Sequence, residues 1–171
     1  MPYLSVRDVL QRTQDFHRQV REWCDEVDAG ADRDAAWVVE YIRHSESSFR
    51  AIVDGFCKTS PKAVLDTWVQ NVPDREVQAV INRRRVAGPM PIGDVVRSIV
   101  EFDAAITALY NHMATTLVPP RVADVFRSLA TVQEAMNRDY SRKLLDLVDQ
   151  GSADPAGRSP IDGEVAEETS E

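Results

Sequence analysis

The sequence predicts an all-α protein whose four long helices form a bundle, with one long crossover between the second and third helices. Four long stretches carry apolar residues at the helical spacing of i, i+3 and i+4. Tight turns join the first stretch to the second and the third to the fourth. The connection between these two pairs, over about 57–92, has roughly 35 residues, whereas helix connections in bundles usually have about 2–8. No segment shows the alternation of a strand convincingly.

The first helical pair is expected at about 5–28 and 33–56, with Gly30 in the turn between them. Ser5-x-x-Asp8 resembles a capping box in which Asp replaces the usual Glu. The apolar stripe of the first helix comprises Val6, Val9, Thr13, Phe16, Val20, Trp23 and Val27, and that of the second Val38, Tyr41, Ile42, Ser45, Phe49, Ile52 and Phe56.

The crossover is expected to contain two short helices. The first covers about 61–66, because Ser60 can cap it and proline is favoured at the first helical position. The second begins at Pro73 and ends before the glycine–proline run at 88–91. Trp68 lies between them in a stretch that looks extended, and we expect its ring to close one end of the bundle.

The second helical pair is expected at about 94–117 and 121–149, with Pro119 and Pro120 in the turn. Its stripes comprise Val95, Val96, Ile99, Asp103, Ile106, Tyr110, Met113 and Leu117 on one helix, and Val122, Val125, Phe126, Leu129, Val132, Met136, Tyr140, Leu144 and Leu147 on the other. The sequence thus predicts one domain over 1–150. Residues 151–171 hold six acids, one arginine and little apolar content, so we expect a disordered acidic tail.

Charge and hydropathy exclude two classes of partner. The formal net charge is −8, and no basic face suggests nucleic-acid binding. The one basic cluster, Arg83 to Arg85, is expected at a solvated helix end, where cations favour the helix dipole. No stretch approaches the roughly 18 apolar residues of a membrane span, and the N-terminus lacks an apolar signal core. We therefore expect a cytoplasmic protein without a membrane partner.

Several polar residues are expected to face the core near the middle of their helices. A helical wheel with about 100° per residue places one or two of them on each long helix. They are His17 beside Thr13, the pair Ser45 and Ser48, Asp103 with Tyr110 further along the same helix, and Gln133 with Met136.

This layout resembles the ferritin-like, rubrerythrin-type superfamily over roughly residues 5–149, by topology and spacing. The resemblance implies a di-iron site with one Glu from each of two helices and a Glu-x-x-His pair from each of the others. The single Glu positions match His17 and Asp103, and the pairs match Ser45/Ser48 and Gln133/Met136. Because only Asp103 is a carboxylate, we expect no functional di-iron centre.

The most direct expectation is a non-enzymatic bundle protein of unknown role in which His17, Ser45, Ser48, Asp103, Tyr110 and Gln133 form a hydrogen-bonded core network. No catalytic residue, metal or cofactor is then expected. The alternative is a degenerate metalloprotein or oxidoreductase with a single Fe, Mn or Zn ion near His17 and Asp103. A homodimer or a protein partner is possible, with Trp37 and Trp68 as candidate anchors, although both fit better as core or cap residues.

Overall fold

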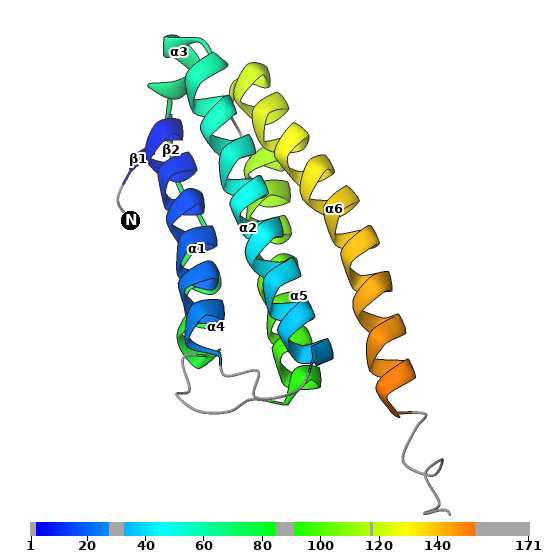
Figure 1. Cartoon of the computed structure of the whole chain (residues 1–171). Helices are drawn as coiled ribbons and strands as arrows, with labels where there is room; N and C mark the ends of the chain where they lie inside the picture. Colours follow the sequence, from blue (N-terminus) through cyan, green and yellow to red (C-terminus); the bar gives the residue numbers. More distant parts are fainter. Residues whose placement is uncertain (1–2, 28–32, 85–90, 117, 153–171) are drawn as a thin grey trace, which may run out of the picture.

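A computed structural model describes residues 3–27, 33–84, 91–116 and 118–152, and it confirms the all-α prediction. Most of the described chain is helical: it forms six helices, and two short strands pair with each other (Figure 1). No described helix combines the length and the apolar character that a membrane crossing requires. The elements are β1 (Leu4–Ser5), α1 (Val6–Glu26), α2 (Arg33–Thr59), α3 (Lys62–Leu65), β2 (Trp68–Val69), α4 (Asp74–Arg84), α5 (Ile92–Thr115) and α6 (Pro120–Ser152).

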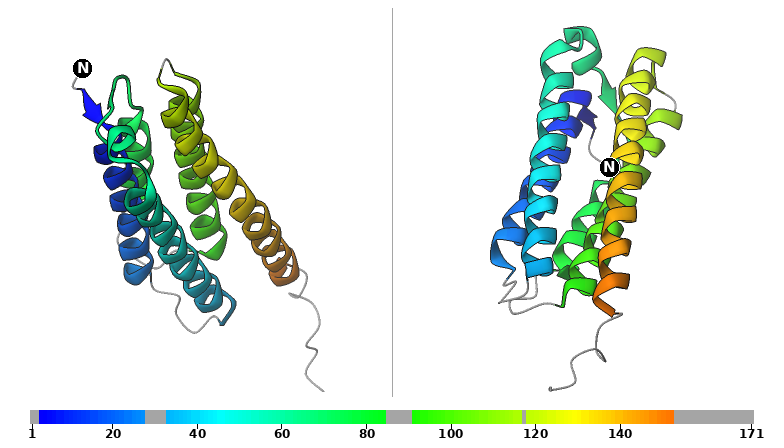
Figure 2. Two further views of the ribbon diagram at one scale, coloured as in Figure 1. Left: turned by 90° about the horizontal axis from the view of Figure 1, so that it is seen from above. Right: turned by 45° about the vertical axis from the view of Figure 1, so that its right-hand side comes forward.

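The long helices lie in two pairs. Helix α1 packs along α2, and α5 packs along α6 (Figures 1 and 2). Helix α4 fills the space beside α1 and α5 and so joins one pair to the other. Helices α2 and α6 also touch, but α6 leans away from α2 toward its C-terminal end (Figure 1). Helix α6 continues to Ser152, slightly beyond its expected end.

The start of α1 has the capping box that its sequence suggests. The Ser5 hydroxyl accepts a hydrogen bond from the Asp8 amide at 3.1 Å, and the Asp8 carboxylate accepts one from the Ser5 amide at 2.9 Å. These bonds satisfy two backbone N–H groups that the first turn of a helix leaves open. The hydrogen bonds from Ser5 also lower the pKa of Asp8, since they favour its ionised form.

The stretch around Trp68 is extended as expected and forms β2. The crossover differs from expectation in three other respects. β1 and β2 form an antiparallel ribbon with Leu4 opposite Val69, a strand pair too short to show alternation in the sequence. Val69 points inward, so the neighbouring Trp68 points outward and is 66% exposed, and the prediction that it closes the bundle is wrong. Pro61, rather than Ser60, is the N-cap residue of α3.

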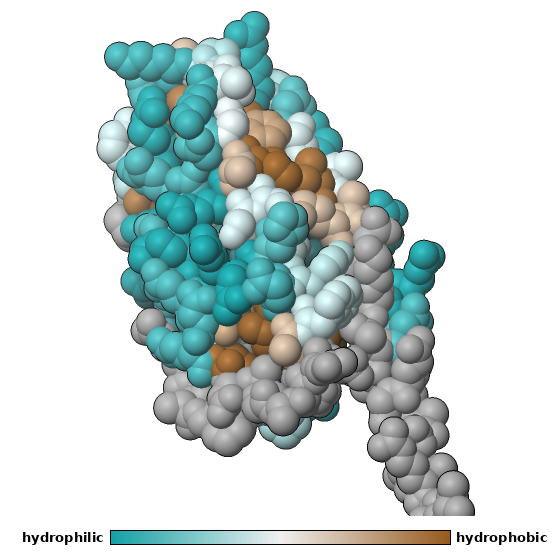
Figure 3. All heavy atoms as spheres, in the orientation of Figure 1, coloured by the Kyte–Doolittle hydropathy of each residue, from teal (hydrophilic) through white to brown (hydrophobic). Residues whose placement is uncertain are grey.

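The core combines apolar residues of all four long helices with the inner side of α4. Its largest fully buried side chains are Tyr110, Phe49, Phe102, Phe126, Leu10, Ile42, Ile99, Ile106, Leu109, Met113 and Leu129. Trp37, expected as a core or cap residue, is 47% exposed and stacks on Tyr41. The face shown in Figure 3 is mainly hydrophilic, with an apolar band between α2 and the first part of α6. The half-buried apolar residues of these two helices include Ile52, Phe56 and Val125.

Candidate functional site: a buried polar cluster

All four long helices bring polar side chains to the buried interior, and one from each helix belongs to one of two hydrogen-bonded pairs. These residues are His17 of α1, Glu46 of α2, Asp103 of α5 and Gln133 of α6, which we call the polar cluster; their relative exposures are 1%, 5%, 6% and 3%. Burial of charged or polar groups is costly unless they pair with one another. The hydrogen bonds of the cluster therefore decide what it can do.

His17 and Glu46 form the tighter half of the polar cluster. The imidazole Nδ1 lies 2.6 Å from a Glu46 carboxylate oxygen. The ring is enclosed by Phe49, whose centroid is 4.5 Å away, and by Phe102, which meets it edge-on at 5.5 Å. Such apolar walls exclude water and strengthen the bond between the two polar groups. The other ring nitrogen, Nε2, is buried and makes no hydrogen bond to any described residue.

Asp103 and Gln133 form the second half. Gln133 donates from Nε2 to Asp103 at 3.0 Å and to the side-chain oxygen of Asn137 at 3.2 Å. In this arrangement the buried Gln133 Oε1 has no partner among the described residues. Asn137 also fits better when its amide is turned over, because its nitrogen then lies 3.2 Å from the second Asp103 oxygen and from the Gln133 carbonyl.

The surroundings of Asp103 favour a proton on its carboxyl group. Burial raises the pKa of Asp103 well above its ordinary value, the negative charge of Glu46 raises it further, and the Gln133 hydrogen bond opposes both. Asp103 is thus held toward its neutral form.

Two expected members of the network lie outside the cluster. Thr13 donates its hydroxyl hydrogen to the Leu10 carbonyl at 2.8 Å. Tyr110 is fully buried, and burial raises the pKa of its hydroxyl. Its ring stacks on Phe49 with centroids 6.2 Å apart, so it supports the wall around His17. Within the described part of the chain, no hydrogen bond links either residue to the polar cluster.

The prediction that Ser45 and Ser48 face the core is wrong. Both are half-buried, and Ser48 bonds back to the His44 carbonyl at 3.0 Å. The inward position belongs to Glu46, which lies four residues after the fully buried Ile42. The sequence contains the signal, because a stripe of Val38, Ile42, Phe49 and Val53 passes through position 46. The predicted core face of α2 also included the half-buried Tyr41, Ile52 and Phe56. These residues moved the centre of the predicted face away from Glu46.

Several other titratable groups of α1 and α2 lie outside the polar cluster. Glu40 pairs with Arg43, and His44 is exposed, so this combination lies outside the cluster. Cys24 and Cys57 are both free thiols. Burial raises the pKa of Cys24 to about 12, which keeps it in the unreactive thiol form at neutral pH.

The chemistry available to the polar cluster is limited by how its groups are paired. No hydrogen bond or ion pair between described side chains joins His17 to Asp103. Within the residues that the structure describes, no three His, Cys, Asp or Glu side chains converge as a metal site would require. The chain matches no family model, no curated protein and no solved structure.

Proposed function

We propose that the chain is a non-enzymatic, ferritin-like helical bundle protein that works through its surface or its assembly and has no functional di-iron centre. The architecture supports this proposal at the level of connectivity. Two pairs of long helices are joined by a segment that contains α3, β2 and α4, as in bundles with one long crossover.

The observation that carries the proposal is the pairing of both buried carboxylates within the chain. Glu46 is paired with His17, and Asp103 with Gln133. Two iron ions bring at least about four positive charges and need several carboxylates to balance them. Glu46-x-x-Phe49 has the spacing of a Glu-x-x-His pair, yet the residue at the histidine position is an apolar ring packed against His17.

In this proposal the polar cluster keeps the helices in register. An axial shift of about 1.5 Å, one residue of helix rise, would separate Glu46 from His17 or Asp103 from Gln133. Each separation would leave a buried polar group without its partner, which costs more than the intact pair contributes to stability. The cluster then selects one helix arrangement over its neighbours.

The surface provides the features that the rest of the proposal needs. Tyr3 and Trp68 are 59% and 66% exposed, at the ribbon of β1 and β2. Exposed aromatic residues are enriched where proteins contact partners. Sedimentation equilibrium of the wild-type chain and Trp68→Ser would show whether this aromatic pair mediates self-association.

A second candidate function is the binding of a single Fe, Mn or Zn ion at the polar cluster. Two observations favour it: Glu46 adds a second carboxylate, and the buried Nε2 of His17 has no partner among the described residues. In that case the ion would replace the proton of Asp103 and the hydrogen bond between His17 and Glu46.

Elemental analysis of protein purified without chelators separates the two candidates. The main proposal expects far less than one metal ion per chain and a melting temperature unchanged by added Mn²⁺, Zn²⁺ or anaerobic Fe²⁺. A bound ion would stabilise the folded state, by about 2.7 kcal/mol at a hundred times its Kd. Stoichiometric metal in the wild-type protein would overturn the main proposal if it is lost in Glu46→Gln. The control is Glu40→Gln on the exposed side of the same helix, which should retain the metal.

A further inference from the structure

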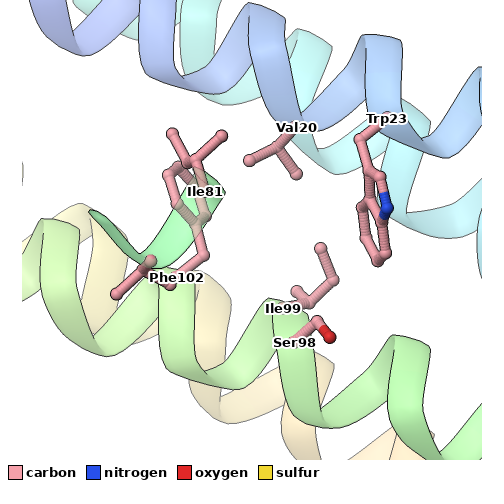
Figure 4. Close-up of a pocket in the computed structure, with 7 residues that line it drawn as sticks. Val20, Trp23, Ile81, Ser98, Ile99 and Phe102 are labelled. Carbon is pink, nitrogen blue, oxygen red and sulfur yellow. The ribbon is translucent and has the colours of Figure 1, made fainter. Parts of the chain in front are cut away.

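A small apolar cavity lies between α1, α4 and α5, separate from the polar cluster. Figure 4 shows Val20 and Trp23 facing Ser98 and Ile99 across it. Its volume is about 20 Å³. The residues that line it are Val20 and Trp23 of α1, Val80 and Ile81 of α4, and Ser98, Ile99 and Phe102 of α5.

The lining of this cavity is mainly apolar. It has room for one small molecule, since a water needs about 10–15 Å³, but an ordered water also needs about two to four polar partners. Ser98 and the indole N–H of Trp23 are the polar groups of the lining, and the Ser98 hydroxyl already donates to the Asp94 carbonyl at 2.6 Å. Every lining residue is at most 8% exposed, so the walls are core rather than surface.

We propose that this cavity binds one small nonpolar gas molecule, of the class that includes dioxygen and the noble gases. Such a molecule gains dispersion contacts with atoms that otherwise face an empty space. It also gives up no hydrogen bonds when it leaves water. A preformed apolar site needs no rearrangement to accept it. This site is independent of the proposed function, because no residue of the polar cluster lines it.

The cavity shares a wall with the polar cluster. Phe102 lines the cavity and meets the His17 ring edge-on at 5.5 Å, and Val20 lies one helical turn after His17 on α1. A molecule in the cavity therefore lies behind the apolar enclosure of His17. Its presence should be reported by the His17 ring resonances as well as by the methyl groups of the lining.

Methyl NMR of the full chain under xenon pressure tests the proposal. We expect saturable chemical-shift changes for the methyl groups of Val20, Val80, Ile81 and Ile99, with a smaller change at the His17 ring. Dissolved dioxygen should broaden the same methyl resonances through its unpaired electrons. Shifts that grow linearly with pressure and are equal across the core would overturn the proposal, as would an ordered water in the cavity of a crystal structure.

Two variants with opposite effects make the test independent of either one folding well. Val80→Ile adds a methylene to the lining and should remove most of the saturable shift. Ile99→Val enlarges the cavity and should lower the xenon pressure needed for half-saturation. Val125→Ile on α6, outside the lining, is the matched control and should behave as the wild type. Wild-type behaviour of both lining variants would refute binding at this cavity.

Discussion

Replacement of Asp103 by Asn tests the claim that this buried acid carries a proton in the folded protein. Asparagine has the shape of the neutral acid and cannot ionise. It offers one oxygen and one N–H group to the Gln133 and Asn137 amides that lie beside Asp103. In wild type, burial and the charge of Glu46 raise the pKa of Asp103 above its ordinary value of 3.8.

The pH dependence follows from proton linkage. Below pH 3.8 the acid is protonated in both the folded and the unfolded chain, and it contributes no slope. Above that pH the unfolded chain ionises while the folded chain keeps its proton, so wild-type stability falls by about 1.4 kcal/mol per pH unit up to the folded pKa. Asp103→Asn has no such loss. Its stability relative to wild type should rise at that rate and then reach a plateau.

Urea unfolding at a series of pH values from about 4.5 to 8 measures this difference. Asp124→Asn is the control, because Asp124 is exposed on α6 and pairs with Arg127 at the surface. This variant should change the free energy of unfolding by less than about 0.5 kcal/mol at every pH. The free energy of unfolding of Asp103→Asn relative to wild type should rise with pH. If this difference stays constant or falls as pH rises, Asp103 is not neutral in the folded protein.

Four further single substitutions, at three places in the structure, test other parts of the account by urea or thermal unfolding. His17→Ala should cost about 3–5 kcal/mol because it leaves Glu46 buried without a partner; added Glu46→Gln should recover part of that loss, and no recovery would contradict the pairing. Ser45→Ala and Ser48→Ala should each lower the free energy of unfolding by less than about 0.5 kcal/mol, as substitutions at the surface do. A decrease above about 2 kcal/mol would show that these serines are core residues after all. Ser5→Ala should cost about 1 kcal/mol through loss of the cap; unchanged stability would count against the capping box.

The sequence predicts the long helices well, because periodicity summed over many residues outweighs local ambiguity. Helix α5 runs over Ile92–Thr115, against an expected 94–117, and the capping box of α1 is present as expected. These features depend on local sequence. The pairing of β1 with β2 depends on contact between segments more than 60 positions apart in the chain, which a two-residue strand cannot signal.

Side-chain direction is the part that periodicity leaves open. His17, Asp103 and Gln133 are buried where the wheel places them, because each lies among strongly apolar neighbours. On α2 the apolar surface is broad, and Tyr41 and Phe56 extend it beyond the core-facing side. On such a helix, a shift of one position in the predicted core face puts Ser45 in the place of Glu46.

The central claim is that the polar cluster is satisfied by hydrogen bonds within the chain, and a crystal structure of protein grown and purified with Fe, Mn and Zn present tests it most directly. We expect hydrogen bonds from His17 to Glu46 and from Asp103 to Gln133, with no metal density between the four residues. Glu46 turned to solvent, or an ion coordinated at this level, would contradict the claim.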